Sequence, residues 1–339
     1  MNTRATQTYR ATLIIAVLAA IAVTAVVGMT TRSWIGQPFP GFLVLRNRVI
    51  ASVGRLEWSA SRDGTLYQYE IVEVDGHRIA GSTDIYEKAG SRPTGTPIVY
   101  TLRRGSTVDR VTVESRLFSA SDYWMVFGSY LATGLLYLIV GLMGAWLVAD
   151  ANLGRAILLL GATGGIYALS GAGIYSGDAN LRLHATAEAF FPATLIYFAA
   201  ACSRLGDRYA APLVTCAAWM SGALAVACQL MLNDPGPYSL IHAACESYMG
   251  VAGFATGVVL IVARSSAQGE SGPVLTSSLA GVMLGLGVPA VIMVLSGVSG
   301  GRLPVNLCTV TAFMCPLCIG WGVVRERLAW GSAPVTVTA

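Results

Sequence analysis

Two histidine–glutamate pairs are the residues of this chain best suited to chemistry. His184 and Glu188 are four residues apart, and so are His242 and Glu246. In a helix this spacing places both side chains of a pair on one face. Each pair stands at the outer end of a predicted membrane span, where Gln229 of a third span can join them. The pairs could therefore converge on a proton, a metal ion or a polar ligand. The alternative is that they are helix-end residues wetted at the membrane surface.

Enzyme motifs are missing from the sequence. Its only histidines are His77, His184 and His242, so there is no His-Glu-x-x-His zinc helix, and no P-loop occurs. The run "ALSGAG" around Ser170 resembles an intramembrane serine protease, but no histidine stands in the usual partner position of a later span. We therefore predict that the protein is not an enzyme and holds no cofactor or resident metal; the histidine–glutamate pairs are expected to sense a ligand or a proton.

The elements that must position these residues are membrane spans. Of 339 residues, 54% are hydrophobic and only 12% are charged, with a mean hydropathy of +0.61. A spanning helix needs roughly 20 mostly apolar residues. About eight segments qualify, at 11–29, 124–149, 156–175, 188–202, 211–232, 242–263, 274–295 and 305–324. The first segment is expected to be an uncleaved anchor rather than a signal peptide, because its apolar run is longer than a signal core.

Arginine placement predicts the orientation of these spans. Short loops on the cytoplasmic side of a membrane are enriched in Lys and Arg. With a cytoplasmic N-terminus, the short outer loops carry only Arg182 and Arg302, and the inner segments carry Arg4, Arg10, Arg155, Arg204, Arg208, Arg264, Arg325 and Arg327. Both termini are then cytoplasmic, and residues 31–121 lie outside. The net charge of +4 is explained by these anchors beside membrane lipid, so we expect no nucleic-acid partner.

The chain is expected to divide into four parts. These are an anchor helix at 1–30, an extracytoplasmic domain at 31–121, a seven-helix membrane bundle at 122–326 and a short cytoplasmic tail at 327–339. The seven cysteines all fall after the second part, so no disulfide framework supports it.

Residues 31–121 have the sequence pattern of a small α+β domain. In "IVEVDGHRIAG" an alternating strand meets an Asp-Gly turn, which is a strong hairpin signal. "GFLVLRNRVIASVG" also alternates, "GSTDIYEKAG" has a Ser/Thr cap before a short amphipathic helix, and "TPIVYTLRRGSTVDRVTVES" indicates two more strands.

This order of elements resembles a PDZ domain. The matching residues are Ile71, Val74, Asp75 and Gly76 of the first hairpin and Gly95, Tyr100, Arg104 and Gly105 of the second. The sequence departs from the family at Gln68 and Tyr69, where a Gly-Asp pair is usual. The resemblance implies that an extracytoplasmic peptide adds as a strand to an open sheet edge. The residues expected to bind it are Gly41, Phe42, Leu43 and Val44, facing Ile85. The alternative is that Phe42 and Val44 are plain core of a rigid spacer.

The chain as a whole is similar to the sensor half of bacterial membrane histidine kinases of the pheromone-receptor type. "FSASDYWMVFGSYLATGLLYLIVGL" resembles their entry into the second span, and "GWGVVRERLAW" resembles their exit towards a cytoplasmic output domain. No phosphoacceptor histidine or ATP-binding region follows, so we expect a fragment of a longer kinase or a module that signals through a partner.

The resemblance implies a receptor or sensor in a bacterial inner membrane. Its expected partners are an extracytoplasmic peptide or small ligand and a cytoplasmic kinase or regulator, with a homodimer as a further candidate. Two other functions stay open: a membrane transporter or channel, and an envelope scaffold that presents the PDZ-like groove to proteases or their substrates.

Overall fold

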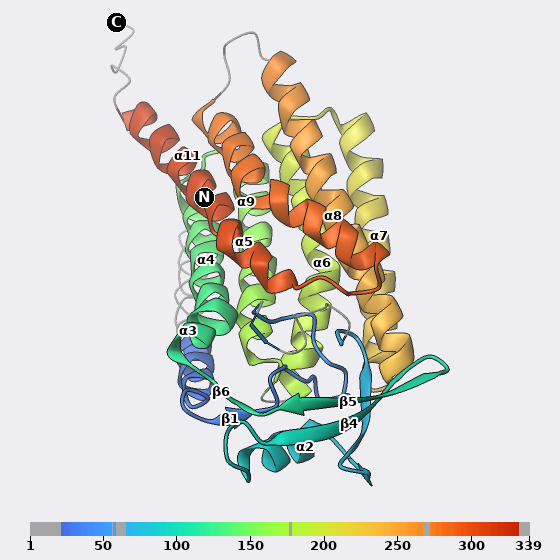
Figure 1. Ribbon diagram of the computed structural model, residues 1–339. Helices are drawn as coiled ribbons and strands as arrows, with labels where there is room; N and C mark the ends of the chain where they lie inside the picture. The colour runs from blue at the N-terminus through green and yellow to red at the C-terminus, as the bar shows by residue number, and fades with distance from the viewer. Residues whose placement is uncertain (1–21, 56, 59–65, 176–177, 267–271, 332–339) are drawn as a thin grey trace, which may run out of the picture.

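The computed structural model describes residues 22–55, 57–58, 66–175, 178–266 and 272–331 (Figure 1). Among these residues, seven helices are long and apolar enough to cross a membrane: Ala120–Leu147, Ala151–Gly173, Asn180–Cys202, Arg208–Met231, Pro235–Ser266, Pro273–Val298 and Val305–Ala329. The chain is therefore a multi-pass helical membrane protein, as its hydropathy predicts. The predicted first span lies partly outside the described residues. Its described part belongs to a helix over residues 22–32.

Within the described part of the chain, the bundle contains seven long helices, two of which are preceded by short helical pieces. The long helices are α4 (Ser129–Leu147), α5 (Ala151–Gly173), α6 (Asp178–Cys202), α7 (Asp207–Met231), α8 (Pro235–Ser266), α9 (Pro273–Val298) and α11 (Met314–Gly331). The helix α3 (Ala120–Tyr123) and the π-helix η1 (Trp124–Gly128) lead into α4, and the 3₁₀-helix η2 (Val305–Cys308) and α10 (Thr309–Ala312) lead into α11. In Figure 1, α9 and α11 lie obliquely across one side of the other helices.

Small residues let the bundle helices approach one another closely, as the Gly-rich runs predict. A Cβ atom added to Gly161 of α5 would lie 2.5 Å from the Tyr137 carbonyl oxygen and 2.5 Å from the Gly141 Cα, both on α4. Backbone atoms cannot yield to such a contact, so these positions require glycine.

The two helices that carry the histidine–glutamate pairs begin well before the hydropathy predicts. The fourth span was expected from residue 188, but α6 already begins at Asp178 and continues through Pro192. The sixth was expected from residue 242, but α8 begins at Pro235. The polar first turns of α6 are held by α7, where the Gln229 amide donates to the Arg182 carbonyl at 2.9 Å. The histidine–glutamate pairs therefore lie inside helices and not at their ends.

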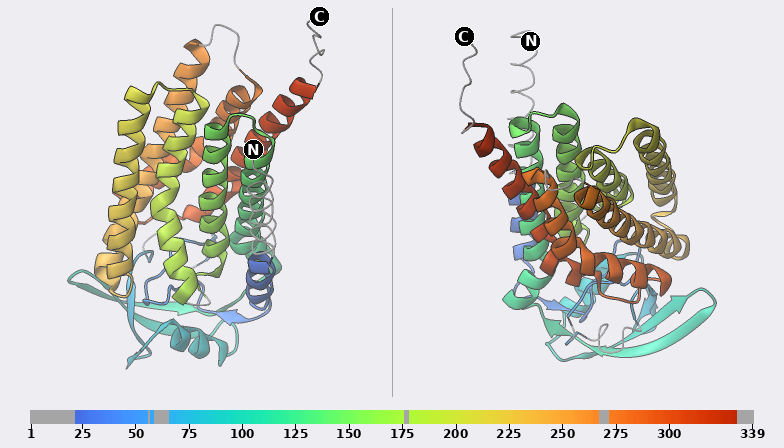
Figure 2. Two further views of the ribbon diagram at one scale, coloured as in Figure 1. Left: turned by 180° about the vertical axis from the view of Figure 1, so that it is seen from behind. Right: turned by 90° about the horizontal axis from the view of Figure 1, so that it is seen from above.

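Residues 34–119 form a small α+β domain, here called the cap domain, which covers one end of the bundle (Figures 1 and 2). Its four-stranded antiparallel sheet has the order β3-β2-β4-β5 and is accompanied by one helix and a two-stranded sheet. The elements are β1 (Pro38–Phe39), β2 (Glu70–Val74), β3 (His77–Arg78), α2 (Ser82–Gly90), β4 (Pro97–Arg104), β5 (Thr107–Glu114) and β6 (Arg116–Leu117), with β1 paired to β6.

Both predicted hairpins and the predicted helix of the cap domain are present. The turn residues Asp75 and Gly76 have φ of 52° and 77°, as a tight hairpin turn requires. Burial alone would raise the pKa of Asp75, but the Val99 N–H and the Arg92 guanidinium at 2.6 Å outweigh it and hold the pKa below its usual value. The predicted Ser/Thr cap of the helix is wrong: the N-cap residue is Gly81 and makes no side-chain cap hydrogen bond.

The segment from Gly41 to Ile50 separates the two hydrophobic cores. Alternating side chains point to opposite sides of an extended segment. Phe42 and Val44 accordingly lie in the core of the cap domain, and Leu43 and Leu45 lie in the core shared with the bundle. This stretch was expected to form longer strands but makes two isolated bridges, one between Val44 and Ile50 and one between Val49 and Glu70.

Buried hydrogen bonds fix the cap domain to the bundle. The Ser52 hydroxyl donates to the Gly301 carbonyl at 2.5 Å. The Asn306 side chain accepts from the Gly54 N–H at 3.0 Å and donates to the Gly54 carbonyl at 3.1 Å. Asn47 donates to the Leu232 carbonyl at 2.9 Å. Such satisfied polar contacts between apolar surfaces specify one relative position of the two parts.

Candidate functional site

The structure brings one histidine and two glutamates together beneath the cap domain. His242 Nδ1 lies 3.0 Å from Glu188 Oε1, and His242 Nε2 lies 3.4 Å from Glu246 Oε1. We call these three residues the His242 cluster. The glutamates are 2% and 1% exposed, so the cluster is not a wetted helix end. Helix α6 supplies Glu188 and α8 supplies the other two, because four-residue spacing keeps His242 and Glu246 on one face.

His184 does not join the cluster through a hydrogen bond or ion pair among the described residues. Its Nδ1 lies 3.0 Å from the Tyr167 carbonyl oxygen and 3.3 Å from Ser170 Oγ, and its ring stacks on Tyr167 at 4.7 Å. A carbonyl oxygen only accepts, so Nδ1 carries the proton. The Ser170 hydroxyl itself donates to the Ile166 carbonyl at 2.5 Å. A protonated Nδ1 cannot take a proton from Ser170, so this contact lacks the geometry of a serine–histidine nucleophile.

The Gln229 side chain contacts residues outside the His242 cluster, contrary to the sequence-based prediction. Its amide nitrogen donates to the Arg182 carbonyl at 2.9 Å and to Thr186 Oγ1 at 3.0 Å, and its oxygen accepts from Arg182 Nη1 at 3.2 Å. The expectation that Gln229 joins the histidine–glutamate pairs is wrong, because its side chain is used to hold the first turns of α6.

A small cavity lies between the His242 cluster and the cap domain. It has a volume of about 30 Å³, enough for a few water-sized groups. Aromatic side chains of the bundle line it together with Ser52 and Gln68 of the cap domain: Tyr130, Tyr167, Tyr175, Tyr238, His184 and His242. Tyr238 stacks on the His242 ring at 5.6 Å, which holds the imidazole between two carboxylates.

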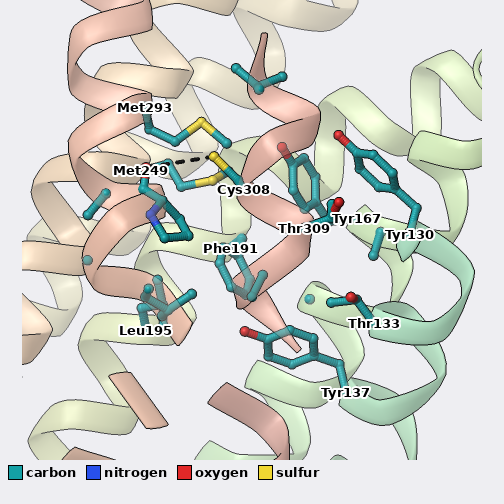
Figure 3. A pocket seen from close by; sticks show the side chains of 18 residues that line it. Tyr130, Thr133, Tyr137, Tyr167, Phe191, Leu195, Met249, Met293, Cys308 and Thr309 are labelled. Carbon is teal, nitrogen blue, oxygen red and sulfur yellow. Dashed lines mark hydrogen bonds between the residues drawn. The ribbon is translucent and has the colours of Figure 1, made fainter. Parts of the chain in front are cut away.

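A second, apolar chamber of about 70 Å³ lies deeper in the bundle (Figure 3). Tyr130 and Tyr167 line both cavities, so the two spaces adjoin. Figure 3 shows the hydroxyls of these two tyrosines turned to the same side, with Phe191, Leu195 and Tyr137 towards the other end of the chamber. Met249, one turn beyond Glu246 on α8, also lines it.

Sequence patterns alone did not identify most of the tyrosines that line these cavities. Tyr238 precedes His242 by four residues, which places it on the same face of α8. Tyr130 and Tyr167 had no such signal, because an isolated tyrosine in an apolar span can face lipid, a neighbouring helix or a cavity.

The residues predicted to bind a peptide are buried in the cap domain. Phe42, Val44 and Ile85 share its hydrophobic core at 0% exposure, and Leu43 is turned towards the bundle. The Val44 N–H donates to the Tyr86 hydroxyl at 2.8 Å, and this hydroxyl lies 3.3 Å from the Val44 carbonyl oxygen.

Gly41 precedes this segment with a φ of 78°, a conformation that favours glycine. Trp34 packs edge-on against the Tyr86 ring at 5.0 Å. A peptide can therefore pair with Val44 only if Tyr86 moves. The role of Gly41, Phe42, Leu43, Val44 and Ile85 in peptide binding stays a prediction.

In the part of the chain that the structure describes, no group of three or more His, Cys, Asp or Glu side chains is placed to hold a metal ion. No family model matches the chain, and comparisons with curated proteins and with solved structures find no match either.

Proposed function

We propose that this protein is a receptor or sensor module of a bacterial inner membrane, with the cap domain outside and both termini in the cytoplasm. It recognises an extracytoplasmic ligand and passes the signal through the bundle to a cytoplasmic kinase or regulator. The His242 cluster is the switch, and the module does no chemistry of its own.

The observation that carries this proposal is the burial of the His242 cluster directly beneath the cap domain. Ionisable residues in a membrane span are costly and mark functional sites by default. A buried ion pair is also weak support for stability compared with apolar packing of the same volume. A cluster that contributes little to stability and sits where the cap domain meets two helices is well placed to change state when a ligand arrives.

The cap domain supports a recognition role. Its hairpin–helix–hairpin order is that of the PDZ resemblance, and Gln68 has a φ of 63° at the position where that family usually has glycine. The backbone there thus has the conformation that the family's glycine would favour. We propose that the cap domain is PDZ-like, with Tyr86 occupying the place of a peptide.

The interior of the bundle favours a receptor over a transporter. A transport path needs polar or charged side chains at several depths. Here the His242 cluster lies at the cap end, and the chamber beyond it is lined by apolar and aromatic groups such as Phe191, Leu195 and Met293. A scaffold role would not require the buried ionisable groups of the His242 cluster.

Hydrogen exchange on the full-length protein in nanodiscs tests the proposed signal. His242→Gln should alter exchange near Arg325 and Arg327, at the end of α11 away from the cap domain, because the cluster couples α6 to α8. His77→Gln, at an exposed position of β3 in the cap domain, is the matched control and should leave those amides unchanged. Changes confined to the helix turns around residue 242 would contradict the sensor proposal.

The proposed orientation has its own test. A reporter that is active only outside the cytoplasm should be active when inserted after Gly90 and silent when inserted after Gly206. The opposite pattern would place the cap domain inside the cell.

A further inference from the structure

The charges of the His242 cluster do not balance. Glu188 and Glu246 contribute two carboxylates, and a single imidazole can contribute at most one positive charge. Among the described residues, no Lys or Arg forms an ion pair with either glutamate. Both oxygens of Glu246 also lack a hydrogen-bond partner, although this residue is only 1% exposed. Two carboxyl groups thus share one imidazole, and the cluster keeps buried acceptor atoms that a positively charged donor such as an ammonium group would satisfy.

The cavity above the cluster has the lining that ammonium groups prefer. Four tyrosines surround it, and an aromatic ring face attracts a cation within about 6 Å of its centre. Gln68 of the cap domain is 3% exposed and leaves its Oε1 without a partner, so it offers a further acceptor. Tyrosine rings and a free amide oxygen line this cavity, and the two glutamates lie 3.0 Å and 3.4 Å from the His242 ring that also lines it. Together these groups favour an ammonium group over an anion.

The deeper chamber provides room for an apolar body joined to that head. His242, Glu246 and Met249 follow one another on one face of α8, so Glu246 lies between the residue that lines the small cavity and the residue that lines the chamber. The chamber holds about 70 Å³. A dry cavity of about 150 Å³ accepts benzene. The body must therefore be short, an alkyl chain of only a few carbons.

We propose that the two cavities form one binding site for a small amphipathic amine, with its ammonium group at the His242 cluster and its alkyl group in the apolar chamber. This proposal names the ligand class of the proposed receptor site and rests on that function for its physiological meaning alone. Binding can be measured whether or not a signal follows.

A route from the aqueous side reaches the site beside the cap domain. A groove of about 680 Å³ runs between the cap domain and the first turns of α8. Its lining carries charges of both signs, from Glu70, Asp234, Arg103 and Arg104. Gln68 lines both this groove and the small cavity. Its side chain donates to Ser52 Oγ at 2.9 Å and separates the two spaces. Displacing the Gln68 side chain would therefore connect the small cavity with this groove.

Isothermal calorimetry on the full-length protein in nanodiscs tests this proposal, using n-alkylammonium chlorides from methyl to hexyl and the n-alkanols of equal length. Ammonium compounds should bind more tightly than the matched alkanols. Affinity should rise about fourfold per added methylene until the chamber is full. Met293→Ala enlarges the chamber and should move the best chain length upwards.

Substitutions in the His242 cluster distinguish ammonium binding at this site from binding elsewhere on the protein. Glu246→Gln and Glu188→Gln should each weaken ammonium binding at least about tenfold, because an uncompensated carboxylate is removed. Alkanol binding should persist in both variants, which also shows that they are folded. Glu87→Gln, on the exposed side of α2, is the control and should change neither. Equal binding of ammonium compounds and alkanols would overturn the proposal. So would inorganic ammonium binding as tightly as the alkyl compounds, or ammonium binding that survives the double variant E188Q/E246Q.

Discussion

Replacing His242 with leucine tests whether the cluster is a coupled ionic unit. Leucine is apolar and of similar size, so the helices can keep their packing while Glu188 and Glu246 lose the imidazole that lies 3.0 Å and 3.4 Å from them. Two unit charges about 4 Å apart interact by about 4 kcal/mol at an effective dielectric constant of 20. Removing one partner of a buried ion pair costs about 3–5 kcal/mol. We therefore expect H242L to lower the free energy of unfolding by that amount.

The matching rescue distinguishes charge from packing. The triple variant E188M/H242L/E246M removes all three ionisable groups, and a buried ion pair replaced by apolar residues of similar volume is often neutral or stabilising. Its free energy of unfolding should return to within about 1 kcal/mol of the original protein. His77→Leu is the control, because His77 is exposed in the cap domain; surface changes usually stay within about 0.5 kcal/mol.

The assay is reversible unfolding of the full-length protein in bicelles, by steric trapping or by detergent titration, with all variants measured at one pH. A loss below about 1 kcal/mol in H242L would refute the reasoning, because it would mean that water or lipid headgroups already screen the glutamates. A triple variant as unstable as H242L would also refute it, since packing rather than charge would then account for the loss.

Three further outcomes are expected. Asp75→Asn should reduce the acid dependence of cap-domain unfolding. The folded-state pKa of Asp75 is lowered, so its carboxylate stabilises the fold above the unfolded pKa of about 4, and this stabilisation is lost as the pH falls through the folded pKa. An unchanged dependence of stability on acid pH would contradict the ion-pair account. Gly161→Ala should destabilise the bundle by about 1–3 kcal/mol through overpacking, whereas Gly222→Ala, where an added Cβ meets nothing within 4 Å, should be neutral or slightly stabilising by the same unfolding assay. Tyr86→Ala should free the Val44 N–H, so fluorescence polarisation should detect extended peptides on the variant and not on the original protein; a variant that binds no peptide would show that the edge is structural.

The local sequence pattern was sufficient to predict most helices and hairpins of this protein. The spans follow from continuous apolar runs, because each backbone polar group in a bilayer must be satisfied within its own helix. The hairpin at Asp75 and Gly76 follows from the positive φ that its turn requires. The four-residue spacing of His242 and Glu246 follows from helix geometry alone. The errors at this level were the starts of α6 and α8, which extend into polar sequence, the Ser/Thr cap of α2, and the segment from Gly41 to Ile50, which forms isolated bridges in place of strands.

The partners of the side chains were decided by the tertiary structure. Sequence spacing places His184 beside Glu188, yet Glu188 pairs with His242 of another helix and His184 turns to the Tyr167 carbonyl. Gln229 holds α6 instead of the cluster. These choices depend on how each helix is rotated about its axis and on where two helices cross, and neither quantity is encoded in the periodicity of a single segment. The cavities have the same origin, because an empty space exists only where side chains from several helices and the cap domain fail to fill it.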